Sequence, residues 1–149
     1  ATATMTQVAG AVAGTIALHR AAAAQTSIIT IPVEIPSNSV AQKGAYLKSV
    51  EIDYENLTAD IGTSLTPVVY LVTRTADLSP QTVAAQTFTQ TPTLANSLVA
   101  DQHKLVLTLT TPLWILNTQY VVVQLTLIGT ANSGTNDFLG AVANFTLRI

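Results

Sequence analysis

The residues best placed for acid–base or nucleophilic chemistry are Asp101 and His103, which stand two positions apart. Alternate residues of an extended segment share a face and lie about 6.6–6.8 Å apart. A serine could complete a Ser-His-Asp arrangement, but the sequence contains no Gly-x-Ser-x-Gly elbow that would mark one. We interpret His103 as a loop histidine beside an acid at the start of a strand, and we expect no catalytic residues and no enzymatic activity.

A second group of reactive side chains is acidic. Glu51, Asp53 and Glu55 alternate along one segment, so an extended chain places their carboxylates on one face. Such oxygens suit Ca²⁺, and a carboxylate pair can hydrolyse glycosides if a facing strand supplies the second acid. The chain has only 8 Asp and Glu residues from which to draw that partner. A solvated face that discourages unwanted strand pairing is the favoured interpretation, and we expect no metal and no cofactor.

Two further features could bind ligands. Trp114, the single tryptophan, follows Pro112 at the predicted end of a strand. A lone indole can stack on a sugar, as in lectins, but it is more often an anchor in a core or an interface. Residues 132–137 have the composition of a calcium loop without EF-hand spacing, and we predict an ordinary loop there.

The scarcity of charge is the most informative property of the composition. Charged residues make up 9% of the chain, where about a quarter is usual, while the apolar fraction of 48% is ordinary. A soluble monomer normally keeps a charged surface of mixed sign. This composition therefore predicts that much of the surface contacts protein, above all copies of the same chain. A plain Thr-rich extracellular β-domain is the alternative.

Other partners and chemistries have little support. The 6 basic residues are scattered, so no cluster could neutralise several phosphates, and we expect no direct nucleic-acid binding. No stretch reaches the ~20 apolar residues of a transmembrane helix. The chain has no cysteine, which removes thiolate chemistry and disulfides.

Alternation of apolar and polar residues predicts an all-β domain over residues 26–149. The predicted strands are 27–35, 46–55, 66–75, 104–110, 120–128 and 139–149, with weaker ones at 83–89 and 97–100. Pro32 favours a strand that lies at an edge or is bulged, and Pro112 should end its strand. The run at 68–72 is typical of a central strand buried on both faces. About eight antiparallel strands favour a single jelly-roll β-sandwich, ahead of an immunoglobulin-like one.

The predicted strands also assign residues to the core. In the second strand Val50, Ile52 and Tyr54 should face inward, opposite the acidic residues. The last strand places five apolar residues on one face: Ala141, Ala143, Phe145, Leu147 and Ile149.

Residues 1–25 are predicted to form a separate N-terminal arm, because the small, uncharged runs at 8–18 and 21–24 have little to fold against alone. Such a segment can lie on a neighbouring molecule or add a strand to an exposed sheet edge. A disordered or self-packed tail is the alternative. We expect assembly contacts at Val8, Val12, Ile16, Leu18 and Trp114.

Three stretches resemble the single jelly-roll coat proteins of viruses: AYLKSVEIDYENLTADIGTSLTPVVY from Ala45, the strand with Trp114, and GAVANFTLRI at the end. The resemblance lies in strand rhythm and low charge over about residues 27–149. It implies a capsid subunit located in the virion, with the N-terminal arm tying neighbours together and other virion proteins as further partners. The arm holds only Arg20 and lacks the basic cluster of coats that package RNA, so the chain more closely resembles coats whose genome is enclosed by a membrane or by separate proteins.

Two other functions fit the sequence. An extracellular or cell-surface filament subunit could donate residues 1–25 to the sheet of the next subunit, and a heterologous contact of that kind makes fibres. A carbohydrate-binding module could use Trp114 and tyrosines.

Overall fold

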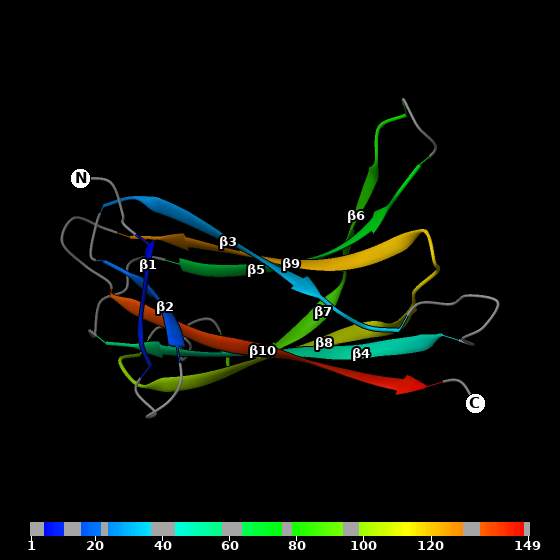
Figure 1. The fold of residues 1–149 in the computed structure, drawn as a ribbon. Coiled ribbons are helices and arrows are strands. Elements are labelled where there is room, and N and C mark those ends of the chain that lie inside the picture. The colour runs from blue at the N-terminus through cyan, green and yellow to red at the C-terminus, as the bar shows by residue number, and fades with distance from the viewer. Residues whose placement is uncertain are drawn as a thin grey trace.

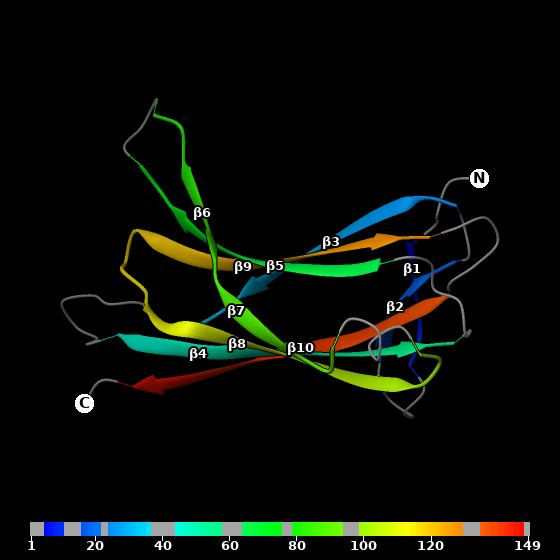
Figure 2. The same ribbon diagram turned by 180° about the vertical axis from the view of Figure 1, so that it is seen from behind.

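The computed structural model describes residues 5–10, 16–21, 24–36, 44–57, 64–75, 79–93, 99–129 and 135–147. Over these residues the chain is all-β, and its strands form two antiparallel sheets that pack face to face (Figure 1, Figure 2). The predicted all-β class is therefore confirmed.

The larger sheet has six strands, in the order β1 (Met5–Ala9), β2 (Ile16–Arg20), β10 (Asn136–Leu147), β4 (Ala45–Asn56), β8 (Gln102–Trp114) and β7 (Phe88–Thr91). The smaller sheet has four strands, in the order β3 (Thr26–Val33), β9 (Gln119–Ile128), β5 (Ser64–Thr73) and β6 (Thr82–Gln86).

Four strand pairs are nested along the chain. β5 pairs with β6, β4 with β8, β3 with β9 and β2 with β10, so each pair encloses the one before it. Two further pairs, β4 with β10 and β5 with β9, join the nested pairs into the two sheets. The pattern is that of one long antiparallel hairpin folded over on itself.

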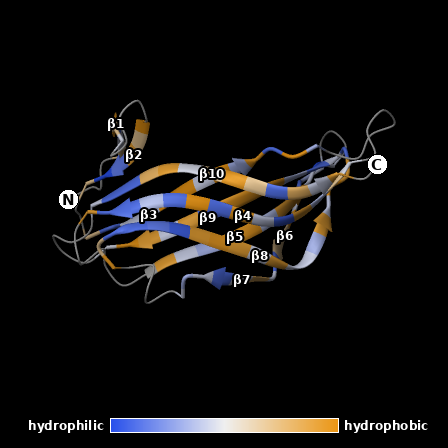
Figure 3. Ribbon diagram, turned by 90° about the horizontal axis from the view of Figure 1, so that it is seen from below, coloured by the Kyte–Doolittle hydropathy of each residue, from blue (hydrophilic) through white to orange (hydrophobic). Residues whose placement is uncertain are grey.

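The core lies between the sheets and follows the predicted alternation. Val50, Ile52 and Tyr54 of β4 are 1% exposed, and they belong to one buried cluster with the inward residues of β9, which are Val121, Val123, Leu125 and Leu127. Each fully buried aliphatic or aromatic side chain contributes about 1.5–3 kcal/mol of transfer free energy, so this alternation drives the two sheets together. The alternation is visible as changing colour along β4 and β9 in Figure 3.

The predictions made from Pro32 and Pro112 have different outcomes. β3 is an edge strand of the smaller sheet, which confirms the prediction from Pro32. The prediction that Pro112 ends its strand is wrong, because β8 continues to Trp114. The ladder between β4 and β8 jumps from Ser49–Thr108 to Leu47–Leu113. Pro112 lies inside that irregularity, where the ladder needs no amide from it.

The predictions for three other strands differ from the structure. β5 does lie between β9 and β6, but Val68 and Tyr70 are half-buried, so the strand is not buried on both faces. β10 begins at Asn136, earlier than predicted, and includes part of the expected loop. The weak strand predicted at 97–100 lies partly outside the described residues, and Val99 and Ala100 are in a bend.

The separate N-terminal arm is not confirmed. β1 and β2 form an antiparallel hairpin, and β2 pairs with β10 through Leu18, His19 and Arg20. The described part of residues 1–25 therefore extends the larger sheet of its own chain.

Candidate assembly surface

The predicted contact residues of the hairpin have unequal exposure. Ile16 is 67% exposed, Val8 is half-buried, and Leu18 packs against the core. Val12 lies outside the described residues. Ile16 is therefore an exposed large apolar residue of the hairpin that another molecule could cover.

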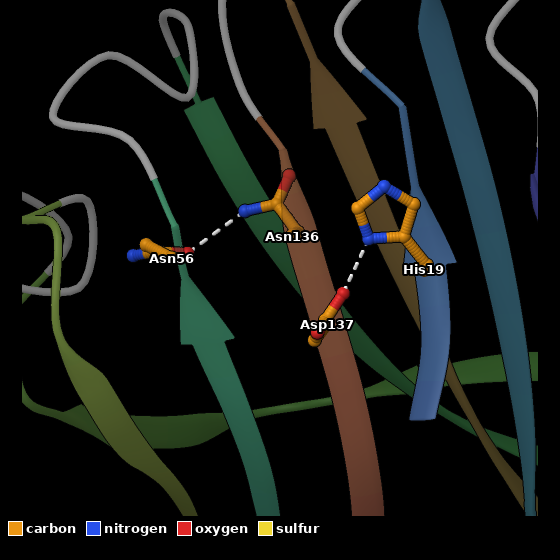
Figure 4. Close-up of polar contacts among 4 residues, drawn as sticks. All are labelled: His19, Asn56, Asn136 and Asp137. Atoms are coloured by element: carbon orange, nitrogen blue, oxygen red, sulfur yellow. Dashed lines mark hydrogen bonds and ion pairs between the residues drawn. The ribbon is translucent and has the colours of Figure 1, made fainter. Parts of the chain in front are cut away.

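His19 of β2 and Asp137 of β10 face each other across the ladder and hold the hairpin to the sheet. His19 Nδ1 lies 2.5 Å from Asp137 Oδ1, and Asp137 is buried (Figure 4). A carboxylate–imidazole pair is the base half of a hydrolytic triad, which also needs a hydroxyl on the other ring nitrogen. The contact joins β2 to β10, and among the described residues no hydroxyl is hydrogen-bonded to His19.

Arg20, the next residue, is fully buried and links β2 to the start of β3. Its Nε donates to Ser27 Oγ at 3.1 Å, and its Nη2 donates to the carbonyl of Gln25 at 2.9 Å. Burial lowers the pKa of the guanidinium from its ordinary value, because desolvation penalises the charged form. The side chain stays charged because an arginine starts from a very high pKa.

A second polar link lies on the other side of β10. Asn136 Nδ2 donates to Asn56 Oδ1 at 2.8 Å (Figure 4). Asn56 Nδ2 in turn donates to the carbonyl of Val99, also at 2.8 Å. Both asparagines are buried. Together with the His19–Asp137 pair, this contact fixes the first residues of β10 between β2 and β4.

Sequence reasoning missed this polar group. Asn136 and Asp137 belong to a stretch whose composition is typical of loops, and His19 is separated from Asp137 by 118 positions. Buried polar side chains are generally hydrogen-bonded, so a partner for Asn136 and Asp137 could be expected once they were known to be buried. The identity of that partner depends on which strands pair, and the sequence does not give the pairing.

Asp101 and His103 are not hydrogen-bonded to each other, and the interpretation of His103 as a loop histidine is wrong, because it lies within β8. Asp101 Oδ1 accepts from the amide of Gln102, while His103 Nε2 lies 2.7 Å from the carbonyl of Val99. The His103 ring instead stacks on Tyr54, with ring centroids 5.2 Å apart.

The acidic residues of β4 lie on the face predicted for them, opposite the core. Glu51 forms an ion pair with Lys104 at 3.2 Å and accepts a hydrogen bond from Asn144 Nδ2 at 2.8 Å. These two donors lower the pKa of the Glu51 carboxyl, the Lys104 bond first. Among the described residues no three His, Asp or Glu side chains are grouped as metal ligands.

Trp114 lies on the outer face of the larger sheet. It stands opposite Tyr46 in the ladder, and the two rings are 4.6 Å apart between centroids and tilted by 50°. Trp114 is half-buried, and Tyr46 is 41% exposed. The pair presents an aromatic surface that either protein or sugar could cover.

The largest departure from the expected core is in the second part of β10. Its residues 141, 143, 145 and 147 share a face, as predicted, and that face is on the side of the buried residues of β4. Phe145 is nevertheless 39% exposed and Leu147 is 58% exposed, while Ile149 lies outside the described residues. A hollow of about 230 Å³ lies beside this face, between Val33 of β3 and Ala141 and Ala143 of β10.

The same part of β10 has an unpaired side. β2 pairs only with residues 136–138, and no other described strand pairs with residues 140–147 on the side away from β4. Figure 3 shows β10 along one side of the molecule, with β1 and β2 at only one of its ends. We call residues 140–147 the β10 edge.

Comparisons of the chain with protein-family models, with curated proteins and with solved structures found no match. The described residues contain no helix long and apolar enough to span a membrane.

Proposed function

We propose that the protein is a structural subunit that assembles with copies of itself, and specifically a virion capsid subunit with a jelly-roll fold. The observation that carries the proposal is the β10 edge, which contains no charged residue and includes the exposed Phe145 and Leu147. Monomeric proteins commonly protect a free strand edge with charge, proline or a covering segment. An unprotected edge with apolar neighbours suits a subunit whose edge is covered in an assembly.

The nested strand pairs support the jelly-roll part of the proposal. A jelly roll is a rolled-up hairpin of eight strands, in which the first pairs with the eighth, the second with the seventh, the third with the sixth and the fourth with the fifth. If β2 is the first strand and β10 the eighth, with β1 and β7 as additions, the four nested pairs follow this order. In that assignment β2 belongs to the domain, and an arm could begin only before it.

The low charge of the chain supports a place in the virion, where subunits cover much of one another's surface. Capsid and lectin domains both use jelly rolls, so the fold alone does not choose between them. The free edge favours the capsid, because a sugar-binding module needs no uncovered strand.

The test is the state of assembly of the purified chain, measured by sedimentation velocity over a wide concentration range and by negative-stain microscopy. We expect discrete oligomers or closed shells whose proportion rises with concentration. A monomer at every concentration contradicts the proposal. If that monomer also gains thermal stability with a glycan, the Tyr46–Trp114 pair becomes the binding surface of a carbohydrate-binding module instead.

A filament subunit is the second candidate, and the same β10 edge favours it. A strand donated by a neighbour could add to the edge by main-chain hydrogen bonds, and a heterologous contact of that kind propagates into fibres. Fibres in the micrographs, in place of closed particles, would support this alternative.

A further inference from the structure

The β10 edge has the length and composition of a pairing strand. It offers main-chain groups over residues 140–147, and among the described strands β2 covers only the residues before it. Val142 on the outer face is 52% exposed, and Leu147 on the inner face is 58% exposed. The edge therefore has both unpaired backbone and apolar surface to bury.

The absence of charge narrows the choice of partner. Residues 140–147 include no Asp, Glu, Lys or Arg, so the edge offers no counter-charge to an acidic or basic peptide. The same absence removes the like-charge repulsion that opposes pairing of a strand with its own copy. A second copy of the same strand is the partner that this edge fits.

We propose that two molecules pair through their β10 edges, antiparallel about a two-fold axis at Ala143, and so join two six-stranded sheets into one. This inference rests on the proposed self-assembly and specifies one contact between subunits. A two-fold interface uses the same patch on both subunits, which a strand paired with its own copy satisfies.

Side-chain size supports this register. With Ala143 opposite its own copy, Ala141 lies opposite Phe145 of the second copy, so on the inner face each large ring meets a small residue. On the outer face Val142 lies opposite Asn144 of the second copy. Sites directly opposite each other have Cβ atoms about 4.5–5.5 Å apart, which is close enough for these contacts.

The position of β2 also limits the register. β2 pairs with β10 as far as Phe138, so a second strand on that side must end near Leu139. With the axis at Ala143, Leu147 of the second copy stands opposite Leu139, one residue beyond the end of the β2–β10 ladder at Phe138. A two-fold axis nearer to Phe138 would drive the second strand into β2.

Disulfide trapping tests the pairing directly, because the natural chain has no cysteine. Two cysteines facing each other across the axis can reach the short Cα separation that a disulfide needs. The test variant is Ala143→Cys, and the control is Val83→Cys on β6, a residue 58% exposed on the edge of the other sheet. After mild oxidation, we expect several-fold more covalent dimer from A143C than from V83C.

A mixture of two further variants checks the register and guards against misfolding of A143C. Equal amounts of A141C and F145C, oxidised together, should give the mixed dimer in excess over either self-dimer, as measured by intact mass. Excess dimer from A143C or excess mixed dimer from the pair supports the two-fold pairing.

The failures are distinguishable. If the natural chain assembles but neither measurement exceeds the V83C level, the β10 pairing is overturned and the assembly proposal stands. If the natural chain is a monomer at every concentration and no trapping occurs, both proposals are overturned.

Discussion

The two parts of β10 have opposite surroundings. Residues 136–138 pair with β2 on one side and β4 on the other, and all three side chains are buried. Residues 140–147 pair with β4 alone among the described strands, and Phe145 and Leu147 are exposed. Both parts belong to one continuous strand. The difference in side-chain burial therefore follows from which strands lie beside each part.

The comparison has built-in controls, because two residue types occur in both parts. Asn136 and Phe138 lie in the enclosed part, and Asn144 and Phe145 lie in the open part. The same substitution in each member of a pair separates the effect of the surroundings from the effect of the side chain.

The phenylalanine pair should give the largest difference. Phe138 is 8% exposed and stacks near Tyr54, with ring centroids 6.1 Å apart. We expect Phe138→Ala to lower the free energy of unfolding by about 3–5 kcal/mol, as for other buried aromatics. We expect Phe145→Ala to lower it by less than about 1 kcal/mol, because that ring is part-exposed before assembly. Urea unfolding at a concentration where the chain is monomeric measures both.

The second readout for the same pair is assembly. F145A removes apolar area from the β10 edge, so it should weaken self-association in sedimentation velocity while the monomer remains folded. Equal losses of stability from F138A and F145A would contradict the division of β10 into an enclosed part and an open part.

The sequence predicted more about the faces of strands than about their neighbours. Alternation identified the inward residues of β4 and the shared face of residues 141, 143, 145 and 147, because side chains of a strand alternate whatever pairs with it. Whether that face is covered depends on the lengths and positions of β2 and β3. Those depend on contacts between residues far apart in the chain, which periodicity does not encode.

The buried polar group was unpredictable for the same reason. Asn136 and Asp137 have the composition of turn residues, yet they are buried because Asn56 and His19 supply hydrogen-bond partners. Pro112 shows the opposite case, in which a residue that normally ends a strand is tolerated inside an irregular ladder.

The asparagine pair should give an intermediate difference. Asn136→Ala leaves the buried Oδ1 of Asn56 without the donor at 2.8 Å, so we expect a loss of about 1–3 kcal/mol. Asn144 donates to Ser49 and Glu51 on a half-buried outer face, and Asn144→Ala should cost less than about 1 kcal/mol. Denaturant midpoints of the two variants, compared at constant slope, give both values. A loss from N144A as large as that from N136A would show that the open part of β10 is held as firmly as the enclosed part.

The smallest expected effect is the pH dependence of stability that comes from Glu51 of β4, which accepts a hydrogen bond from Asn144 in the open part of β10. Hydrogen bonds from Lys104 and Asn144 lower the pKa of the Glu51 carboxyl in the folded chain. A carboxyl with a lowered folded pKa stabilises the fold above its unfolded pKa, and that contribution disappears as the pH falls through the folded pKa. Near neutral pH, Glu51→Gln should therefore be less stable than the natural chain.

The gap between E51Q and the natural chain should close on acidification below the ordinary carboxyl range, about pH 4, because Glu51 then becomes neutral as well. It should also narrow at high salt, since Lys104 is largely exposed and its attraction to Glu51 is screened. Unfolding free energies of both chains from neutral to acid pH test this. A gap that stays constant with pH would show that the outer face of the β10 edge is held by packing, and not by the charge of Glu51.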